Sequence, residues 1–159
     1  MTRTCGTLLL LLIGISSVPT TVEAQALGYA VAGPAGISGF FSSSAASVHA
    51  VGGVEALAGG RVGVGGEVGV FANSSSALLT ASANGVVHLA RATVSPFVTG
   101  GYTRMGSGEG GFNAWNLGVG ADYWVRSRVG LRVDFRDHVR PDSRGTVHYW
   151  TIRGGVVFR

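Results

Sequence analysis

Four carboxylates and three arginines are notable because each falls on the polar side of a segment whose residues alternate in polarity. Such a set permits three kinds of chemistry: a carboxylate pair for general acid–base catalysis, a path for protons or ions, or a network of ion pairs. The acids come from separate segments with arginines among them, which argues against a catalytic pair. The residues are Glu55, Glu67, Asp122 and Asp134 with Arg132, Arg136 and Arg153, and His49 and His88 share their faces.

Two histidines near the end of the chain suggest a metal site or an acid–base site. His138 and His148 flank a predicted loop, and Asp137 and Asp142 are close to them in sequence. A metal site needs three or four ligands that converge on one point. The spacing does not show such convergence, so we expect a pair of histidines at a rim, facing solvent. The sequence therefore predicts no catalytic residue, no metal and no cofactor.

Glycine-rich runs at 63–66 and 118–120 suggest a nucleotide-binding loop at first sight. A phosphate loop needs a glycine turn that leads into a helix whose N-terminus faces the phosphate. Here the glycines alternate with valines and no helix is predicted after them. We interpret them as small side chains inside a narrow, strongly curved barrel.

The elements that carry these residues are three consecutive segments of alternating polarity, Asn113–Val125, Val129–His138 and His148–Phe158. In the middle segment, Leu131 lies on the apolar side and Arg132 on the polar side. A β-strand sends successive side chains to opposite faces, so each segment is predicted to be one strand. Segments of about ten residues that alternate in this way, in an exported protein, are typical of a transmembrane β-barrel.

The first 24 residues have the features of a cleaved export signal. Arg3 gives a short positive region, Leu8–Ile15 is an apolar stretch too short to span a bilayer, and Val22-Glu23-Ala24 offers small residues for cleavage after Ala24. Cys5 would leave with the signal, so the mature chain would contain no cysteine. We expect a signal peptide at 1–24 and one barrel domain at 25–159.

The composition agrees with export to a membrane. Charged residues make up 13% of the chain, against roughly 25% in ordinary soluble domains. The chain has no second apolar run of about eighteen residues, so no spanning helix is expected. The twelve basic residues are all arginine and give a net charge of +4. They are scattered along the sequence, whereas nucleic-acid binding needs a basic stripe, so no nucleic-acid partner is expected.

Eight strands are expected in the mature chain, joined by links that alternate strictly between short and long. The short links are 58–60, 90–93 and 126–128, and the long links are 34–47, 72–77, 104–112 and 139–147. Outer-membrane barrels have short periplasmic turns and longer outer loops, so both termini are predicted on the periplasmic side. The predicted strands are near 26–33, 48–57, 61–71, 78–89, 94–103, 113–125, 129–138 and 148–158.

Aromatic residues are predicted to form two belts where the barrel meets the lipid headgroups. Counted along the predicted strands, nearly all of them fall near strand ends, whereas a soluble sandwich would concentrate them in its core. Those near the outer ends are Phe71, Tyr102, Phe112, Trp115, Tyr149 and Trp150. Those near the periplasmic ends are Tyr29, Phe97, Tyr123, Trp124 and Phe158.

With this pattern the chain resembles the small eight-stranded outer-membrane β-barrels, which share their architecture with the transmembrane domain of outer membrane protein A. Such proteins usually end in an aromatic residue preceded by apolar residues at alternate positions, a signal for the barrel-assembly machinery. Here Arg159 follows the aromatic residue, which departs from the pattern. The resemblance implies the outer membrane of a diderm bacterium, with lipid and the assembly machinery as partners. The ladder is Trp150, Ile152, Gly154, Val156 and Phe158.

Some barrels of this kind are enzymes that act on the acyl chains of lipid A through serine and histidine at the outer rim. Ser107, Ser143, Glu109, His138 and His148 could supply such groups. The chain has no His-x-Ser pair of the deacylase kind, however. We therefore do not predict an enzyme.

The sequence thus predicts an all-β fold, an eight-stranded antiparallel up-and-down transmembrane β-barrel that follows a signal peptide. Its predicted role is structural or surface contact, with no chemistry of its own. A barrel of this size holds side chains but hardly a water column, and unpaired buried charges are costly, so the inward charges are expected to pair. The alternatives are a lipid A-modifying enzyme, a narrow channel and a soluble periplasmic barrel that binds an apolar ligand.

Overall fold

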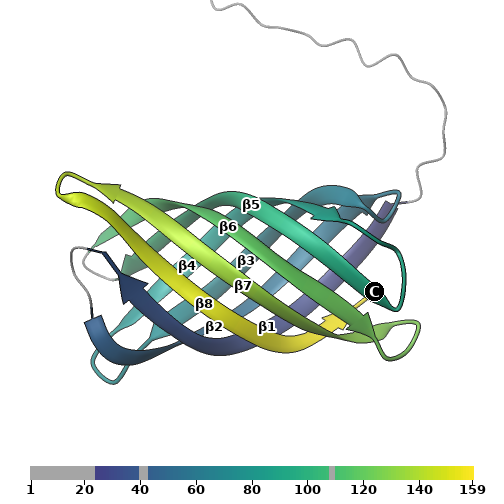
Figure 1. Cartoon of the computed structure of the whole chain (residues 1–159), viewed down its shortest axis with the longest axis horizontal. Helices are drawn as coiled ribbons and strands as arrows, with labels where there is room; N and C mark the ends of the chain where they lie inside the picture. Colours follow the sequence, from purple (N-terminus) through teal and green to yellow (C-terminus); the bar gives the residue numbers. More distant parts are fainter. Residues whose placement is uncertain (1–23, 40–42, 108–109) are drawn as a thin grey trace, which may run out of the picture.

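The computed structural model describes residues 24–39, 43–107 and 110–159. Its strands pair antiparallel with their neighbours in sequence, and β1 pairs with β8 to close a barrel (Figure 1). The predicted fold class is confirmed. Within the described ranges, no helix is long and apolar enough to cross a membrane. The strands are β1 (Ala24–Ser38), β2 (Ser43–Ala58), β3 (Val62–Ala72), β4 (Ala77–His88), β5 (Val94–Ser107), β6 (Gly110–Trp124), β7 (Val129–Asp142) and β8 (Gly145–Phe158).

Two predictions fall partly or wholly outside these ranges. The predicted export signal occupies residues 1–24, of which only Ala24 is described, and Glu109 is not described. The signal peptide and its cleavage site therefore stay predictions.

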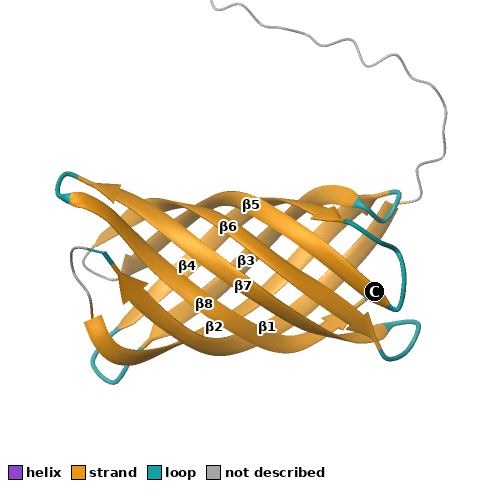
Figure 2. Ribbon diagram, in the orientation of Figure 1, coloured by secondary structure: helices purple, strands orange, loops and turns teal. Residues whose placement is uncertain are grey.

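The links predicted to be long are shorter than the sequence predicts, because most of the strands that flank them are longer (Figure 2). Most of the predicted long link 139–147 is strand, because β7 and β8 stay paired as far as Asp142 opposite Gly145. The remaining link there, 143–144, is shorter than 89–93 at the other end, so the predicted alternation of short and long links is wrong. Glycine, serine and proline lower strand propensity, but a paired neighbour still supplies the backbone ladder. The lengths of the described links therefore do not distinguish one end of the barrel from the other.

Alternation along most strands places apolar residues outside and the charged residues inside, whereas the inward face of β1 is largely apolar, with Leu27 and Val31 buried. The arrangement along most strands is the reverse of that in a soluble barrel, whose apolar residues fill the interior. A barrel with an apolar outer surface is suited to contact with lipid tails. The exposed apolar residues include Val64, Val68, Leu79, Leu117, Val133, Phe135 and Ile152.

The structure corrects part of the predicted aromatic belts. Tyr29, Phe71 and Phe97 are buried inside the barrel, and Trp124 and Tyr149 pack against buried clusters there. The prediction used only the height of each residue along its strand, whereas the face is set by whether its position is odd or even. Five of the predicted residues lie exposed on the outer surface: Tyr102, Trp115 and Trp150 toward one end, and Tyr123 and Phe158 toward the other.

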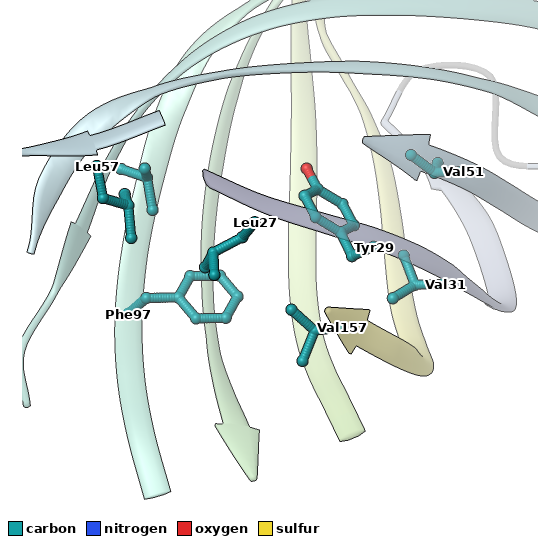
Figure 3. Packing of buried hydrophobic residues seen from close by; sticks show 8 residues of the cluster. Leu27, Tyr29, Val31, Val51, Leu57, Phe97 and Val157 are labelled. Carbon is teal, nitrogen blue, oxygen red and sulfur yellow. The ribbon is translucent and has the colours of Figure 1, made fainter. Parts of the chain in front are cut away.

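Buried side chains close the interior toward both ends. Near the start of β1, an apolar cluster includes Leu27, Tyr29 and Phe97 (Figure 3). Toward the other end, Phe71 and Met105 form a second cluster, against which Phe112 and Tyr149 pack. A layer of charged and polar residues, which forms the candidate site, contacts the first cluster at Tyr29 and Phe97 and extends toward the second.

Glycines on the inner face make room for this filling. A Cβ on Gly53 would meet the ring of Tyr29 at 2.4 Å, and a Cβ on Gly118 would meet Nε of Arg136 at 2.6 Å. Real Cβ contacts are not this short, so both positions need glycine for close approach. This agrees with the interpretation of the 118–120 run as small residues of a narrow barrel.

Candidate functional site

The part of the charged layer nearest the chain termini is built around Arg132, which is only 2% exposed. Its Nε and Nη2 donate to the two oxygens of Asp122, at 2.7 and 2.9 Å. Its Nη1 and Nη2 donate to Glu55 on the other side of the barrel, at 2.7 and 3.3 Å. The guanidinium also lies 4.1 Å from the ring centre of Tyr29 and 4.6 Å from that of Phe97. Arg132 thus joins opposite walls of the lumen.

His88 completes this group. Its Nε2 lies 3.2 Å from Glu55, and its Nδ1 lies 3.0 Å from Oγ of Ser95. Because Ser95 donates its proton to the carbonyl of Ala90, the Nδ1 of His88 must donate to Ser95. The Nε2 faces the Glu55 carboxylate, so His88 links Glu55 to Ser95.

Four carboxylates and three guanidiniums are buried in the described part of the barrel. Most of the buried charge is therefore matched by opposite charge within the lumen.

The second half of the network is centred on Glu67. One of its oxygens accepts from the hydroxyl of Tyr29 at 2.7 Å, from Arg136 at 3.1 Å and from Arg153 at 3.3 Å. Arg153, with no exposed surface, also donates two bonds to Asp134 at 2.8 and 3.0 Å. Each guanidinium in this half therefore has a carboxylate partner.

The structure thus gathers all seven predicted lumenal charges. Asp122 bonds to Arg132, and Asp134 bonds to Arg153. The sequence did not identify Tyr29 as a member, because it assigned that residue to the aromatic belt. The tyrosine lies on the same inward face as Leu27 and Val31, which is the signal that could have found it.

A neutral polar layer continues the network away from the termini. Arg136 donates to Asn116 at 2.9 Å, and Asn116 donates to Asn84 and to Thr103 at 2.8 and 3.0 Å. Thr103 also contacts Nδ1 of His138 at 3.1 Å. His138 is therefore buried in the lumen, and the predicted rim pair with His148 is wrong.

His148 lies elsewhere, on the outer surface, where its Nδ1 is 2.7 Å from Asp137. Both side chains are partly exposed. Among the described hydrogen bonds, neither Ser107 nor Ser143 reaches this pair, so the residues considered for lipid A chemistry do not meet. In the described part of the chain, no group of three or more histidine, cysteine, aspartate or glutamate side chains is placed to hold a metal ion.

The charge network leaves its own groups occupied with one another. Each carboxylate is held by at least one cation at hydrogen-bond distance, and aromatic and polar side chains fill the space beside them. The four carboxylates bond to arginines and not to one another, so they do not form the carboxylate pair that general acid–base catalysis would need. The arrangement fills this part of the lumen with buried, paired side chains.

Comparisons with known proteins identify the fold. No family model matches the chain, and no curated protein matches it. Solved structures do: Neisserial surface protein A, with a TM-score of 0.66 and 16% identity, is matched over 86% of this chain and 98% of that one. The chain has the fold of the small outer-membrane β-barrels.

Two further structures show the same likeness to the barrel. The N-terminal β-barrel domain of Pseudomonas aeruginosa OprF has a TM-score of 0.61 and 14% identity, over 86% of this chain and 98% of that one. Ail, the attachment invasion locus protein of Yersinia pestis, solved with a heparin analogue, has a TM-score of 0.52 and 11% identity, over 84% and 99%. At these identities the likeness concerns the fold.

Proposed function

We propose that this chain is an integral protein of the outer membrane of a diderm bacterium, with a structural or surface-contact role and no chemistry of its own. The observation that carries the proposal is the inversion of the barrel: its outer surface is apolar and its interior holds a network of paired charges. An apolar outer band belongs in lipid, and a closed interior leaves no wide passage for solutes.

Surface contact is assigned to the hairpins at the end away from the termini. A strand of about 9–11 residues crosses a bilayer, whereas β5 and β7 each have 14 residues. Both continue past the exposed aromatic residues Tyr102 and Trp115 on that side of the barrel. These extensions present Arg144 and other polar residues to the medium outside the membrane.

Membrane fractionation with N-terminal sequencing tests the proposal. The mature protein is expected in the outer-membrane fraction, beginning at Gln25. Its C-terminal strand is expected to engage the barrel-assembly machinery, so deletion of Phe158 and Arg159 should reduce insertion more than deletion of Arg159 alone. Recovery of a monodisperse soluble protein without detergent would contradict the membrane assignment.

The alternatives have separate tests. Lipid A mass spectrometry on cells with and without the protein is expected to show no change in acyl chains, and a changed acylation pattern would establish an enzyme instead. The His148–Asp137 pair is the only described histidine–carboxylate pair on the outer surface. His148→Ala is the variant to compare if such a change occurs.

A further inference from the structure

Five arginines gather on one rim of the barrel, although they are scattered in the sequence. This terminal rim holds the start of β1, the end of β8 and the links 59–61, 89–93 and 125–128 (Figure 1). Each link contributes at least one arginine, and another follows β8. The five are Arg61, Arg91, Arg126, Arg128 and Arg159, all exposed.

The described part of the terminal rim has no side-chain carboxylate to neutralise these charges. Arg91 donates to the carbonyl of Gly59 at 3.0 Å, and Arg159 donates to the carbonyl of Ser127 at 2.6 Å. Carbonyl oxygens orient a guanidinium but do not remove its charge. Glu23, just before β1, is outside the described residues and belongs to the segment that we expect to be cleaved.

The rim is also hollowed between these side chains. One cleft of about 480 Å³ lies between the start of β1 and the β6–β7 link, and a second of about 620 Å³ lies between the β4–β5 and β6–β7 links. Both are lined by Arg91, Ser127 and Arg159, with Arg128 in the first and Arg126 in the second. Arg159 is stacked 4.2 Å from the ring centre of Trp124 in the second cleft. Four of the five arginines therefore line concave surfaces.

The position of the arginines along the barrel indicates which kind of anion they bind. Each of four arginines is next in sequence to an exposed apolar residue, so the charges lie at the edge of the apolar outer band. Headgroup phosphates occupy this level in a bilayer, and guanidinium groups bind phosphate through paired hydrogen bonds. The neighbouring apolar residues are Val62, Val125, Val129 and Phe158.

We propose that the terminal rim binds the phosphate groups of anionic phospholipids, with Arg126 and Arg128 as the principal contacts and Arg91 and Arg159 lining the clefts. The site is distinct from the lumenal network and goes beyond a structural role. A soluble phosphate has the same charge chemistry, but it lacks the acyl chains that the adjoining apolar band contacts. The lipid is therefore the occupant that this surface fits.

The test uses the folded full chain in a nonionic detergent. Trp115→Phe and Trp150→Phe leave Trp124, beside Arg159, as the single fluorescent reporter at the rim. Phosphatidylglycerol or phosphatidylcholine is titrated in mixed micelles, and lipid retained on the protein is counted by native mass spectrometry. The test variant is Arg126→Gln/Arg128→Gln. The control, Arg104→Gln/Arg144→Gln, removes the same charge near the opposite end.

We expect phosphatidylglycerol to bind at least about tenfold tighter than phosphatidylcholine, and each lost rim arginine to weaken it about fivefold. The control variant is expected to keep wild-type binding, and added salt to weaken it. Equal binding of the two lipids would overturn the proposal, as would equal losses in both variants. If glycerol 3-phosphate moved the Trp124 signal at the same concentration as the lipid, the site would be one for soluble anions and the lipid assignment would be wrong. Failure of the lipid preference would leave the outer-membrane assignment unaffected, because fractionation tests that separately.

Discussion

Removal of Arg132 is the perturbation that most directly tests the lumenal network. The side chain makes four hydrogen bonds to Asp122 and Glu55 and lies between the rings of Tyr29 and Phe97. In Arg132→Ala, Asp122 loses its cation completely and Glu55 keeps only His88. Breaking a buried ion pair in this way costs about 3–5 kcal/mol, because one partner stays buried without its counter-charge.

Neutralising the abandoned acids should recover most of that loss. Arg132→Met fills part of the space, and Glu55→Gln with Asp122→Asn neutralises the two carboxylates that had bonded to Arg132. Replacing a buried ionic group by neutral residues of similar volume is often close to neutral in free energy. The triple variant is therefore expected to be more stable than Arg132→Ala, although it contains more substitutions. Arg132→Met alone fills the same space as the triple variant, so a loss of packing alone would leave these two variants about equally stable, whereas unmatched carboxylates would make Arg132→Met the less stable.

The assay is urea unfolding of the folded barrel in lipid vesicles. Fluorescence of Trp115, Trp124 and Trp150 follows the transition, since all three lie in described strands. Arg144→Ala is the control, because this exposed residue lies in the β7–β8 link and should change stability by less than about 0.5 kcal/mol. A loss below about 1 kcal/mol for Arg132→Ala, with no recovery in the triple variant, would refute a dry, paired lumen.

Leu117→Arg places a charge on the exposed apolar face and is expected to cost about 2–4 kcal/mol of folding free energy in vesicles; Ser143→Arg, in a link, should be nearly neutral, and equal folding yields would contradict the topology. Gly53→Ala is expected to cost roughly 1–3 kcal/mol in urea unfolding because the lumen is overpacked, whereas Gly52→Ala, with no neighbour closer than 4.0 Å, should be tolerated. In planar bilayers the wild type is expected to show little steady conductance and Arg132→Ala more. Large, stable wild-type channels would instead support the pore alternative.

The fold could be predicted because the alternation of polarity is strong in the last three strands. The same alternation identified the inward face, and with it all seven lumenal charges. Cross-strand partners follow from it too: Asp122 lies directly opposite Arg132, and Asp134 directly opposite Arg153. These pairs need only the register of adjacent strands, which short links determine.

The contacts across the lumen could not be predicted in this way. Glu55 on β2 meets Arg132 on β7, and Glu67 on β3 meets Arg153 on β8. Neither pair of strands is adjacent. Such contacts depend on the diameter of the closed barrel and the tilt of its strands, which one-dimensional alternation does not contain.

The errors in the loops and belts have a common physical origin. Composition indicated where strand propensity is low, but pairing with a neighbour extends a strand through glycine and serine, as at Ser107 opposite Gly110. The position of an aromatic residue along its strand indicated how close it lies to an end of the barrel, but not whether its side chain points inward or outward. The basic rim was missed for a related reason: the links and the chain end that carry its arginines are about 30 residues apart in sequence and meet only when the turns align at one end of the barrel.

The polar interior also bears on why this chain adopts a single register. If both faces of every strand were apolar, a slip of one residue would exchange them at little cost, because lipid and an apolar core are similar environments. Here a slip would turn Arg132, Asp134 and Arg136 toward the lipid. Each arginine at mid-membrane would cost about 2–4 kcal/mol, and its carboxylate partner would be left unmatched inside. The charge network therefore penalises the slipped pairings more strongly than it stabilises the native one, and this difference is what selects the observed register.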